Sequence, residues 1–73
     1  MIADIGKLLE QQPFAPFTIH LADGRALPVP TLDHIYLFPN RATLIVHKDN
    51  GDYDLISGAQ VTSASLEAGD NGR

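Results

Sequence analysis

The sequence predicts a small, mainly β domain in which an N-terminal helix precedes a five-stranded antiparallel sheet that bends strongly or closes into a small barrel. Apolar residues recur at helical spacing only near the N-terminus, and from residue 17 onward they alternate with polar residues at the strand period of two. Short turn sequences separate these segments. A chain of 73 residues has room for one domain, which we place at residues 1–66 with a flexible tail over 67–73.

Composition excludes several functional classes. The chain has no cysteine, which excludes a disulfide scaffold, a thiolate zinc site and a thiol enzyme. Its formal net charge of -4 argues against a general phosphate-binding surface. No apolar run reaches the roughly 20 residues of a membrane span, and no signal-peptide pattern is present. We therefore expect a cytoplasmic protein.

The first element is predicted as a short amphipathic helix over residues 2–11. Its apolar face consists of Ile2, Ile5, Leu8 and Leu9. Pro13 ends the helix because proline lacks the backbone N–H and clashes with the preceding turn. A helix of this length does not persist alone in water, so it must dock on the sheet.

The next segment is predicted as a hairpin whose register follows from keeping apolar residues on one face. A strand over 17–22 alternates apolar and polar residues, and Asp23-Gly24 marks the turn. A loop of residues 22–24, closed by Gly24 in the left-handed region, pairs Phe17 with Val29 and Ile19 with Leu27. A two-residue loop would split the apolar set between two faces.

The remaining strands follow from turn residues and apolar alternation. Pro28 and Pro30 make the second strand an edge or end it, because neither can donate a ladder hydrogen bond. Residues 49–52 form a strong turn signal, and residues 57–59 a tight connection. Further strands are expected over residues 34–38, 42–47, 53–56 and 61–66.

The predicted barrel interior leaves apolar residues without cover. The interior is expected to contain Phe17, Ile19, Leu21, Leu27, Val29, Leu44, Val46, Leu55 and Val61. Outside it remain Phe38, Ile45, Ile56 and Leu66, together with Ile35 or Tyr36, and one short helix can shield only part of them. Surplus apolar surface and open strand edges favour self-association or a protein partner, so Phe38, Ile45, Ile56 and Leu66 are the candidate interface.

Two resemblances involve these segments. Residues 13–25, which read Pro-Phe-Ala-Pro-Phe-Thr-Ile-His-Leu-Ala-Asp-Gly-Arg, with Val29-Pro30 and Val61-Thr62-Ser63, resemble a family of short bacterial proteins without an assigned activity. Residues 55–61 resemble the second signature of the Sm-like fold, and Asp23-Gly24-Arg25 resembles its first hairpin. The resemblance implies an Sm-like or SH3-like barrel, ring assembly through the fourth and fifth strands, and RNA binding. Ser57 occupies the position of the Sm basic residue that contacts RNA.

Other sites have weak sequence support. Arg25, Arg41 and Lys48 are the candidate RNA contacts, with Tyr36 and Phe38 as aromatic residues on which bases could stack. The three histidines, His20, His34 and His47, fall in different predicted strands without the spacing of a local metal motif. Residues 49–54 are rich in oxygen ligands but fail the EF-hand pattern. We predict no catalytic residue, cofactor or metal.

These observations lead to one main hypothesis and one alternative. The main hypothesis is a non-enzymatic small-barrel interaction or assembly module that self-associates or binds a protein partner. The alternative is an Sm-like RNA-binding ring protein, which the acidic net charge disfavours.

Overall fold

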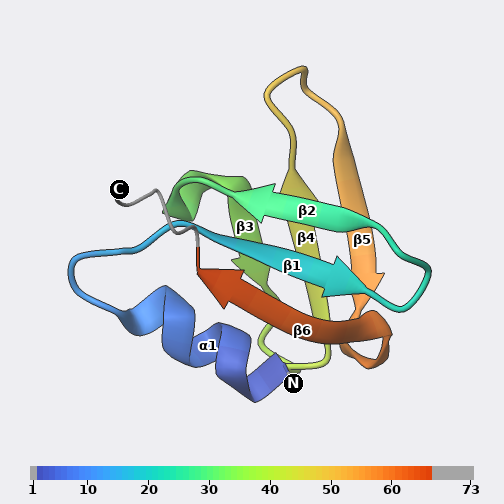
Figure 1. Cartoon of the computed structure of the whole chain (residues 1–73), viewed down its shortest axis with the longest axis horizontal. Helices are drawn as coiled ribbons and strands as arrows, with labels where there is room; N and C mark the ends of the chain where they lie inside the picture. Colours follow the sequence, from blue (N-terminus) through green and yellow to red (C-terminus); the bar gives the residue numbers. More distant parts are fainter. Residues whose placement is uncertain (1, 67–73) are drawn as a thin grey trace.

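The computed structural model describes residues 2–66, so the tail predicted over 67–73 lies outside the described residues (Figure 1). One α-helix, six strands and two short 3₁₀ helices make up this part of the chain. In chain order they are α1 (Ile2–Glu10), β1 (Phe17–Leu21), β2 (Ala26–Val29), η1 (Leu32–His34), β3 (Ile35–Leu37), β4 (Thr43–His47), β5 (Tyr53–Ser57), η2 (Gly58–Gln60) and β6 (Val61–Leu66).

The strands form two antiparallel sheets that pack face to face. The order is β2-β1-β6 in one sheet and β3-β4-β5 in the other, which we call the first and second sheet. Their strands cross at a steep angle, with the first sheet in front of the second in Figure 1. The mainly β class with an N-terminal helix is therefore confirmed.

The prediction of five strands closing into a barrel is wrong, because no ladder runs around the corners between the two sheets. Between β2 and β3 the chain passes through Pro30 and η1, and Pro28 removes a donor from β2 itself. Between β5 and β6 the chain turns through η2, where the Ser57 hydroxyl accepts from the Ala59 N–H. At the other corner the Thr31 hydroxyl accepts the Asp33 N–H, so each corner bonds a backbone N–H to a local side chain and not to a continuing ladder. The described residues therefore form six strands in two separate sheets.

The predicted register of the first hairpin is confirmed. Phe17 lies opposite Val29 and Ile19 opposite Leu27. Gly24 has φ +94°, a conformation that favours glycine, and its N–H donates to the Leu21 carbonyl at 3.0 Å. The Leu21 N–H in turn donates to the Arg25 carbonyl at 2.9 Å, which closes the three-residue loop.

The core lies between the two sheets and is entirely apolar. The buried side chains are Ile5, Phe17, Ile19, Leu21, Leu27, Val29, Ile35, Leu44, Val46, Ile56 and Val61. The core takes in Ile5 of the helix and Ile35 of β3, neither of which was in the predicted interior. Of the nine residues predicted there, eight are buried; the exception is Leu55, which is 63% exposed, while Ile56 is 1% exposed. The reason is the pairing of β5 with β4, which sets Ile56 opposite the buried Leu44 and Leu55 opposite Ile45.

The helix lies beside β6 and covers one end of the sandwich (Figure 1). Ile5 is fully buried, which meets the requirement that so short a helix must dock. Gly6 faces the loop after β3, and a Cβ there would lie 2.5 Å from the Arg41 guanidinium. At nine residues, α1 is less than half the length that a helix needs to cross a bilayer, and no described helix is longer.

Candidate interaction surface

The outward face of the second sheet carries a row of apolar side chains in register across all three strands. Tyr36 of β3 lies opposite Ile45 of β4, and Ile45 lies opposite Leu55 of β5. Tyr36 is 53% exposed and Leu55 63%, while Ile45 between them is half-buried. Directly opposed side chains on one sheet face contact each other, so these three form one continuous surface.

Aromatic rings extend this row at both ends. The Phe38 ring packs edge-on against Tyr36 at a centroid distance of 5.4 Å. Tyr53, 62% exposed, lies beside the His47 ring at 6.2 Å. We call Tyr36, Phe38, Ile45, Tyr53 and Leu55 the outer apolar face. The other outward positions of these strands hold Thr43, His47 and Ser57, so none of them carries a carboxylate, lysine or arginine.

The outward face of the first sheet is polar on β1 and β6 and carries only the small apolar residues Ala26 and Pro28 on β2. His20 Nε2 and Ser65 Oγ share a hydrogen bond of 2.9 Å, and the Thr62 hydroxyl donates to the His20 carbonyl at 3.1 Å. Ser63, opposite His20, is exposed. The two outward faces therefore differ in chemistry, and only that of the second sheet offers apolar surface across its whole width.

The structure separates the four predicted interface residues. Phe38 and Ile45 lie half-buried on the outer apolar face. Leu66 is 57% exposed, but it ends β6 of the first sheet, opposite Phe17. Ile56 is buried, so its predicted outward position is wrong for the same reason that Leu55 is exposed. Tyr53 and Leu55, both exposed on this face, were not among the predicted interface residues.

The β4–β5 turn contains the information that places Leu55 on the outer apolar face. Gly51 has φ +95°, and its N–H donates to the Lys48 carbonyl at 3.1 Å. The Lys48 N–H donates to the Asp52 carbonyl at 2.8 Å, so this loop repeats the build of the first hairpin. The same three-residue register, counted outward from Lys48 and Asp52, sets Ile45 opposite Leu55.

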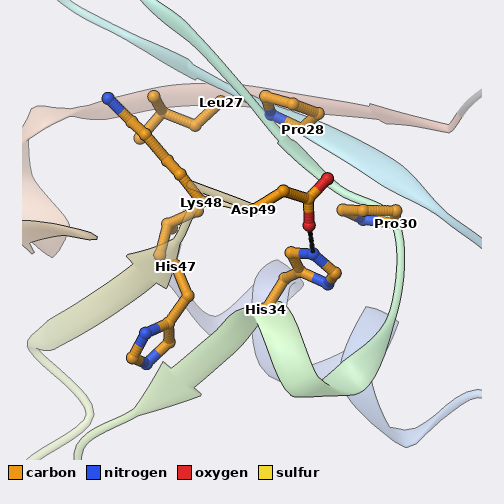
Figure 2. A pocket seen from close by; sticks show the side chains of 8 residues that line it. Leu27, Pro28, Pro30, His34, His47, Lys48 and Asp49 are labelled. Atoms are coloured by element: carbon orange, nitrogen blue, oxygen red, sulfur yellow. Dashed lines mark hydrogen bonds and ion pairs between the residues drawn. The ribbon is translucent and has the colours of Figure 1, made fainter. Parts of the chain in front are cut away.

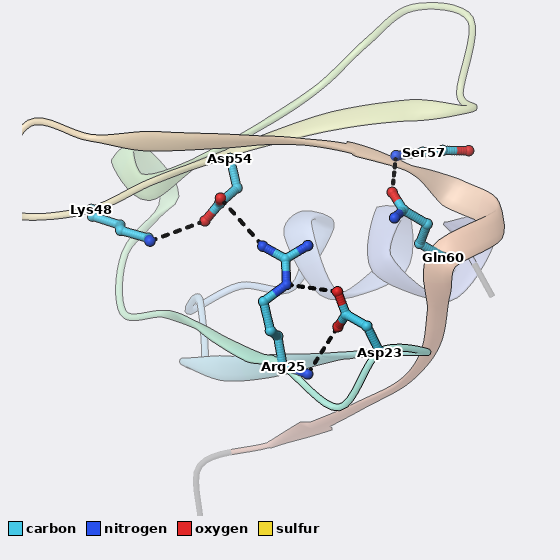
Figure 3. Close-up of polar contacts among 6 residues, drawn as sticks. All are labelled: Asp23, Arg25, Lys48, Asp54, Ser57 and Gln60. Atoms are coloured by element: carbon cyan, nitrogen blue, oxygen red, sulfur yellow. Dashed lines mark hydrogen bonds and ion pairs between the residues drawn. The ribbon is translucent and has the colours of Figure 1, made fainter.

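The predicted RNA-contacting cations do not gather at one place. Arg25 and Lys48 converge on Asp54 of β5, with Arg25 Nη1 at 3.5 Å from Oδ1 and Lys48 Nζ at 3.3 Å from Oδ2 (Figure 3). Arg25 Nε also donates to Asp23 Oδ2 at 2.9 Å. Arg41 lies instead beside Gly6 of the helix. The contacts of Arg25 and Lys48 let Asp54 occupy an inward position of β5 with its side chain 21% exposed.

Asp23 combines a turn role with this ion-pair network. Its carboxylate accepts the Arg25 backbone N–H at 3.0 Å as well as the Arg25 side chain. The backbone hydrogen bond, followed by the side-chain contact with Arg25, lowers the pKa of the Asp23 carboxyl from its ordinary value. The Asp23 side chain is half exposed, where water screens the ion pair, so we expect Asp23 to shape the turn and to add little to the free energy of unfolding.

A cavity of about 130 Å³ opens between β2 and the β4–β5 turn (Figure 2). Leu27, Pro28 and Pro30 form its apolar wall, and His34 and Asp49 lie at its mouth. The volume is well below the roughly 300 Å³ at which pockets for small-molecule ligands begin. The Nε2 atom of His34 lies 2.7 Å from Asp49 Oδ1, so the pair ties η1 to the turn beneath the cavity.

Hydroxyl, imidazole and carboxylate meet here in the order of a catalytic triad, because Thr31 Oγ1 lies 2.9 Å from His34 Nδ1. The Thr31 hydroxyl, however, also accepts the Asp33 N–H at 3.1 Å and so caps η1. The Asp49 carboxylate is 93% exposed, where water screens its effect on the imidazole. The contacts of Thr31, His34 and Asp49 therefore hold η1 and the β4–β5 turn in place, and no catalytic role is needed to account for them.

The histidines do not assemble a metal site in the part of the chain that the structure describes. His20 pairs with Ser65, His34 with Asp49 and Thr31, and the His47 ring lies against Tyr53 on the outward side of the second sheet. No group of three or more histidine or carboxylate side chains within residues 2–66 could hold an ion.

Comparisons of the chain with protein-family models, with curated proteins and with solved structures found no match.

Proposed function

We propose that this protein is a non-enzymatic interaction module that binds a protein surface, its own or that of another protein, through the outer apolar face. The observation that carries the proposal is the uncharged row of Tyr36, Ile45 and Leu55 in register across the second sheet. Each of these strands also uses its inward face in the core, so the outward row is not needed to hold the two sheets together.

The energetics of this face support binding. Transfer of an apolar side chain of this size out of water stabilises a complex by about 1.5–3 kcal/mol. Tyrosine is also among the residues that most often dominate binding energy, because its ring is rigid and amphipathic. Tyr36 and Tyr53 are both more than half exposed, so a partner would gain most from covering them.

The RNA-binding alternative has less support. Tyr36 and Phe38 present aromatic surface for base stacking, but no cation lies at the outward positions of the three strands. Arg25 and Lys48 are engaged with Asp54, and the whole chain carries a formal charge of -4. Single-strand binders need positive charge along the backbone path as well as rings.

Site-specific photocross-linking in cells tests the proposal. Replacing Tyr36 with the photoreactive analogue p-benzoylphenylalanine keeps an aromatic side chain on the outer apolar face, and the same substitution at Ser63 probes the polar outward face as the matched control. We expect a discrete protein adduct from position 36 and none from position 63. The additional substitution Ile45→Lys, at the centre of the face, should abolish the adduct while the circular dichroism spectrum stays unchanged.

Two outcomes would overturn the proposal. One is the absence of any adduct from position 36 above the level seen from position 63. The other is an adduct that persists undiminished in the folded Ile45→Lys variant, since a charge in the middle of a desolvated contact costs several kcal/mol.

A further inference from the structure

The outer apolar face ends at an open strand edge, and the hydrogen-bond pattern shows which backbone groups are directed outward there. The Lys48 N–H donates to the Asp52 carbonyl and the Gly58 N–H to the Ala42 carbonyl. Residues 52 and 58 thus turn their backbone groups toward β4. Because these directions alternate along an antiparallel strand, residues 54 and 56 do the same. Tyr53, Leu55 and Ser57 therefore direct their N–H and C=O groups away from β4.

Part of this edge is closed and part is open. The Ser57 N–H donates to Gln60 Oε1 at 3.1 Å, so the end of β5 next to η2 is capped by a side chain (Figure 3). Within residues 2–66, no hydrogen-bond partner is seen for the outward backbone groups of Tyr53 or Leu55. The open part of the edge therefore centres on Leu55.

The other three strand edges of the sandwich are each protected. Proline at position 28 interrupts β2, and Pro30 follows it. The β3 edge is only three residues long. Helix α1 lies alongside β6, where Leu8 and Ala64 line a common groove. β5 has five residues, with no proline and no charged side chain on its outward face. Its one inward charge, Asp54, is a feature that can protect an edge, but it is paired with Arg25 and Lys48 of its own chain.

We propose that β5 pairs antiparallel with β5 of a second copy of this chain, about a two-fold axis at Leu55, to give a six-stranded sheet across the dimer. The inference rests on the proposed function, because it names the partner and the contact of the same surface. In this register the two Leu55 residues exchange both backbone hydrogen bonds, and Tyr53 of each copy lies opposite Ser57 of the other. A strand paired antiparallel with itself is self-complementary, as a two-fold interface requires.

Charge selects the register of the pairing. Each copy carries a formal charge of -4, so the two copies repel each other and their contact must add no further like charge. The outward side chains Tyr53, Leu55 and Ser57 meet this condition. A register centred one residue earlier would set the two Asp54 carboxylates directly opposite each other, which is destabilising. Centring on Leu55 sets each Asp54 opposite Ile56 and leaves it paired with its own Arg25 and Lys48.

The pairing also continues the outer apolar face. The row Tyr36, Ile45 and Leu55 of one copy meets the same row of the other copy at the two Leu55 side chains. A standard interface buries roughly 800 Å² per partner, which is under a fifth of the 4493 Å² surface of this chain. Pairing of one five-residue edge buries less than that. We therefore expect a dimer with a dissociation constant in the micromolar range.

Removal of one backbone donor tests the inference. The full chain is short enough for chemical synthesis, and N-methylation of Leu55 removes the outward N–H without changing any side chain of the outer apolar face. Because the two-fold axis doubles the loss, the dissociation constant measured by sedimentation equilibrium should rise at least about tenfold. The fold should be unaffected, because this N–H points away from β4. N-methylation of Ala26 is the matched control, because Ala26 is an exposed residue of the edge strand β2 whose N–H also points away from its neighbouring strand, β1.

Cross-linking gives a second readout. The chain lacks cysteine, so Leu55→Cys introduces a single thiol. In the proposed register the two Cα atoms at position 55 lie about 5.5 Å apart. A short homobifunctional thiol reagent should give covalent dimer from Leu55→Cys and none from the control Ser63→Cys, whose position is also exposed.

The outcomes separate this inference from the proposed function. A chain that sediments as a monomer at millimolar concentration, or a dimer that N-methyl-Leu55 does not weaken, overturns the β5 pairing. If position 36 still gives an adduct with a different protein in cells, the outer apolar face stands as an interaction surface and only the second copy is wrong. If neither adduct nor dimer forms, both proposals are wrong.

Discussion

At the scale of single residues, neighbours on β5 have opposite environments. Asp54 faces the interior and is held by Arg25 and Lys48, Leu55 faces water, and Ile56 is in the core. Hydrophobicity alone does not distinguish Leu55 from Ile56. Pairing with β4 does, because it sets Ile56 opposite Leu44. Asp54 takes an inward position of β5, so Ile56 and not Leu55 faces the core. Its partners Arg25 and Lys48 are distant from it in sequence, so the sequence alone does not indicate that a carboxylate can face inward there.

Truncation of these two neighbours should have very different effects. We expect Ile56→Ala to lower the free energy of unfolding by about 2–5 kcal/mol, because it leaves a cavity between the sheets. Leu55→Ala should change it by less than about 0.5 kcal/mol. Urea denaturation measures both, at a concentration low enough to keep the chain monomeric. Equal losses from the two variants would contradict the observed facing of β5.

At the scale of elements, the two longer hairpins share one design. In each, a three-residue loop is closed by a glycine with positive φ whose N–H donates to the carbonyl three residues earlier. Gly24 and Gly51 therefore fix which residues face each other along the whole strand pair. The first hairpin could be predicted because only one register kept its apolar residues together. In the second hairpin both faces are apolar, so the apolar pattern alone did not select a register.

The closing glycine of the first hairpin should not tolerate an L side chain. Gly24→Ala should destabilise the domain by about 1 kcal/mol or more, because φ is +94° there and an L residue is strained. No atom lies within 4 Å of the added methyl group, so the effect would be conformational. A synthetic chain with D-alanine at position 24, which prefers positive φ, should keep the stability of the original. Thermal unfolding of the two chains makes the comparison, and equal destabilisation by both would contradict it.

At the scale of the whole molecule, two open sheets replace the predicted barrel. The sequence signals at Pro28 and Pro30 predicted a break in the second strand and a bend after it, but they did not predict the 3₁₀ helix η1, where the Thr31 hydroxyl accepts the Asp33 N–H. Whether the strands close into a barrel depends on whether the edge strands of the two sheets pair with each other. The alternation of residues along each strand does not determine this. The same limit applies to the outer apolar face, since its row joins three strands that are set beside one another only by two separate turns.

Ionic strength should separate self-association from RNA binding. Two like-charged copies repel each other over a Debye length, which falls from about 30 Å at 0.01 M salt to about 8 Å at 0.15 M. Dimer formation should therefore strengthen severalfold over this range, as measured by sedimentation equilibrium. Contact with a nucleic acid backbone would weaken steeply instead, because bound counterions are released. Association that falls with added salt would contradict an uncharged contact between copies.

The central place of β1 in the first sheet bears on the order in which the domain forms during translation. β1 is bordered by β2, which follows it directly, and by β6, the last strand among residues 2–66. The second sheet uses only strands adjacent in sequence, so it can pair as soon as residue 57 is available and does not need β6. The first sheet must wait for residues 61–66. Until β6 is present, one edge of β1 is unpaired and the apolar faces of the two sheets cannot pack together completely. Pairing of β6 with β1 is therefore the step that completes the native fold.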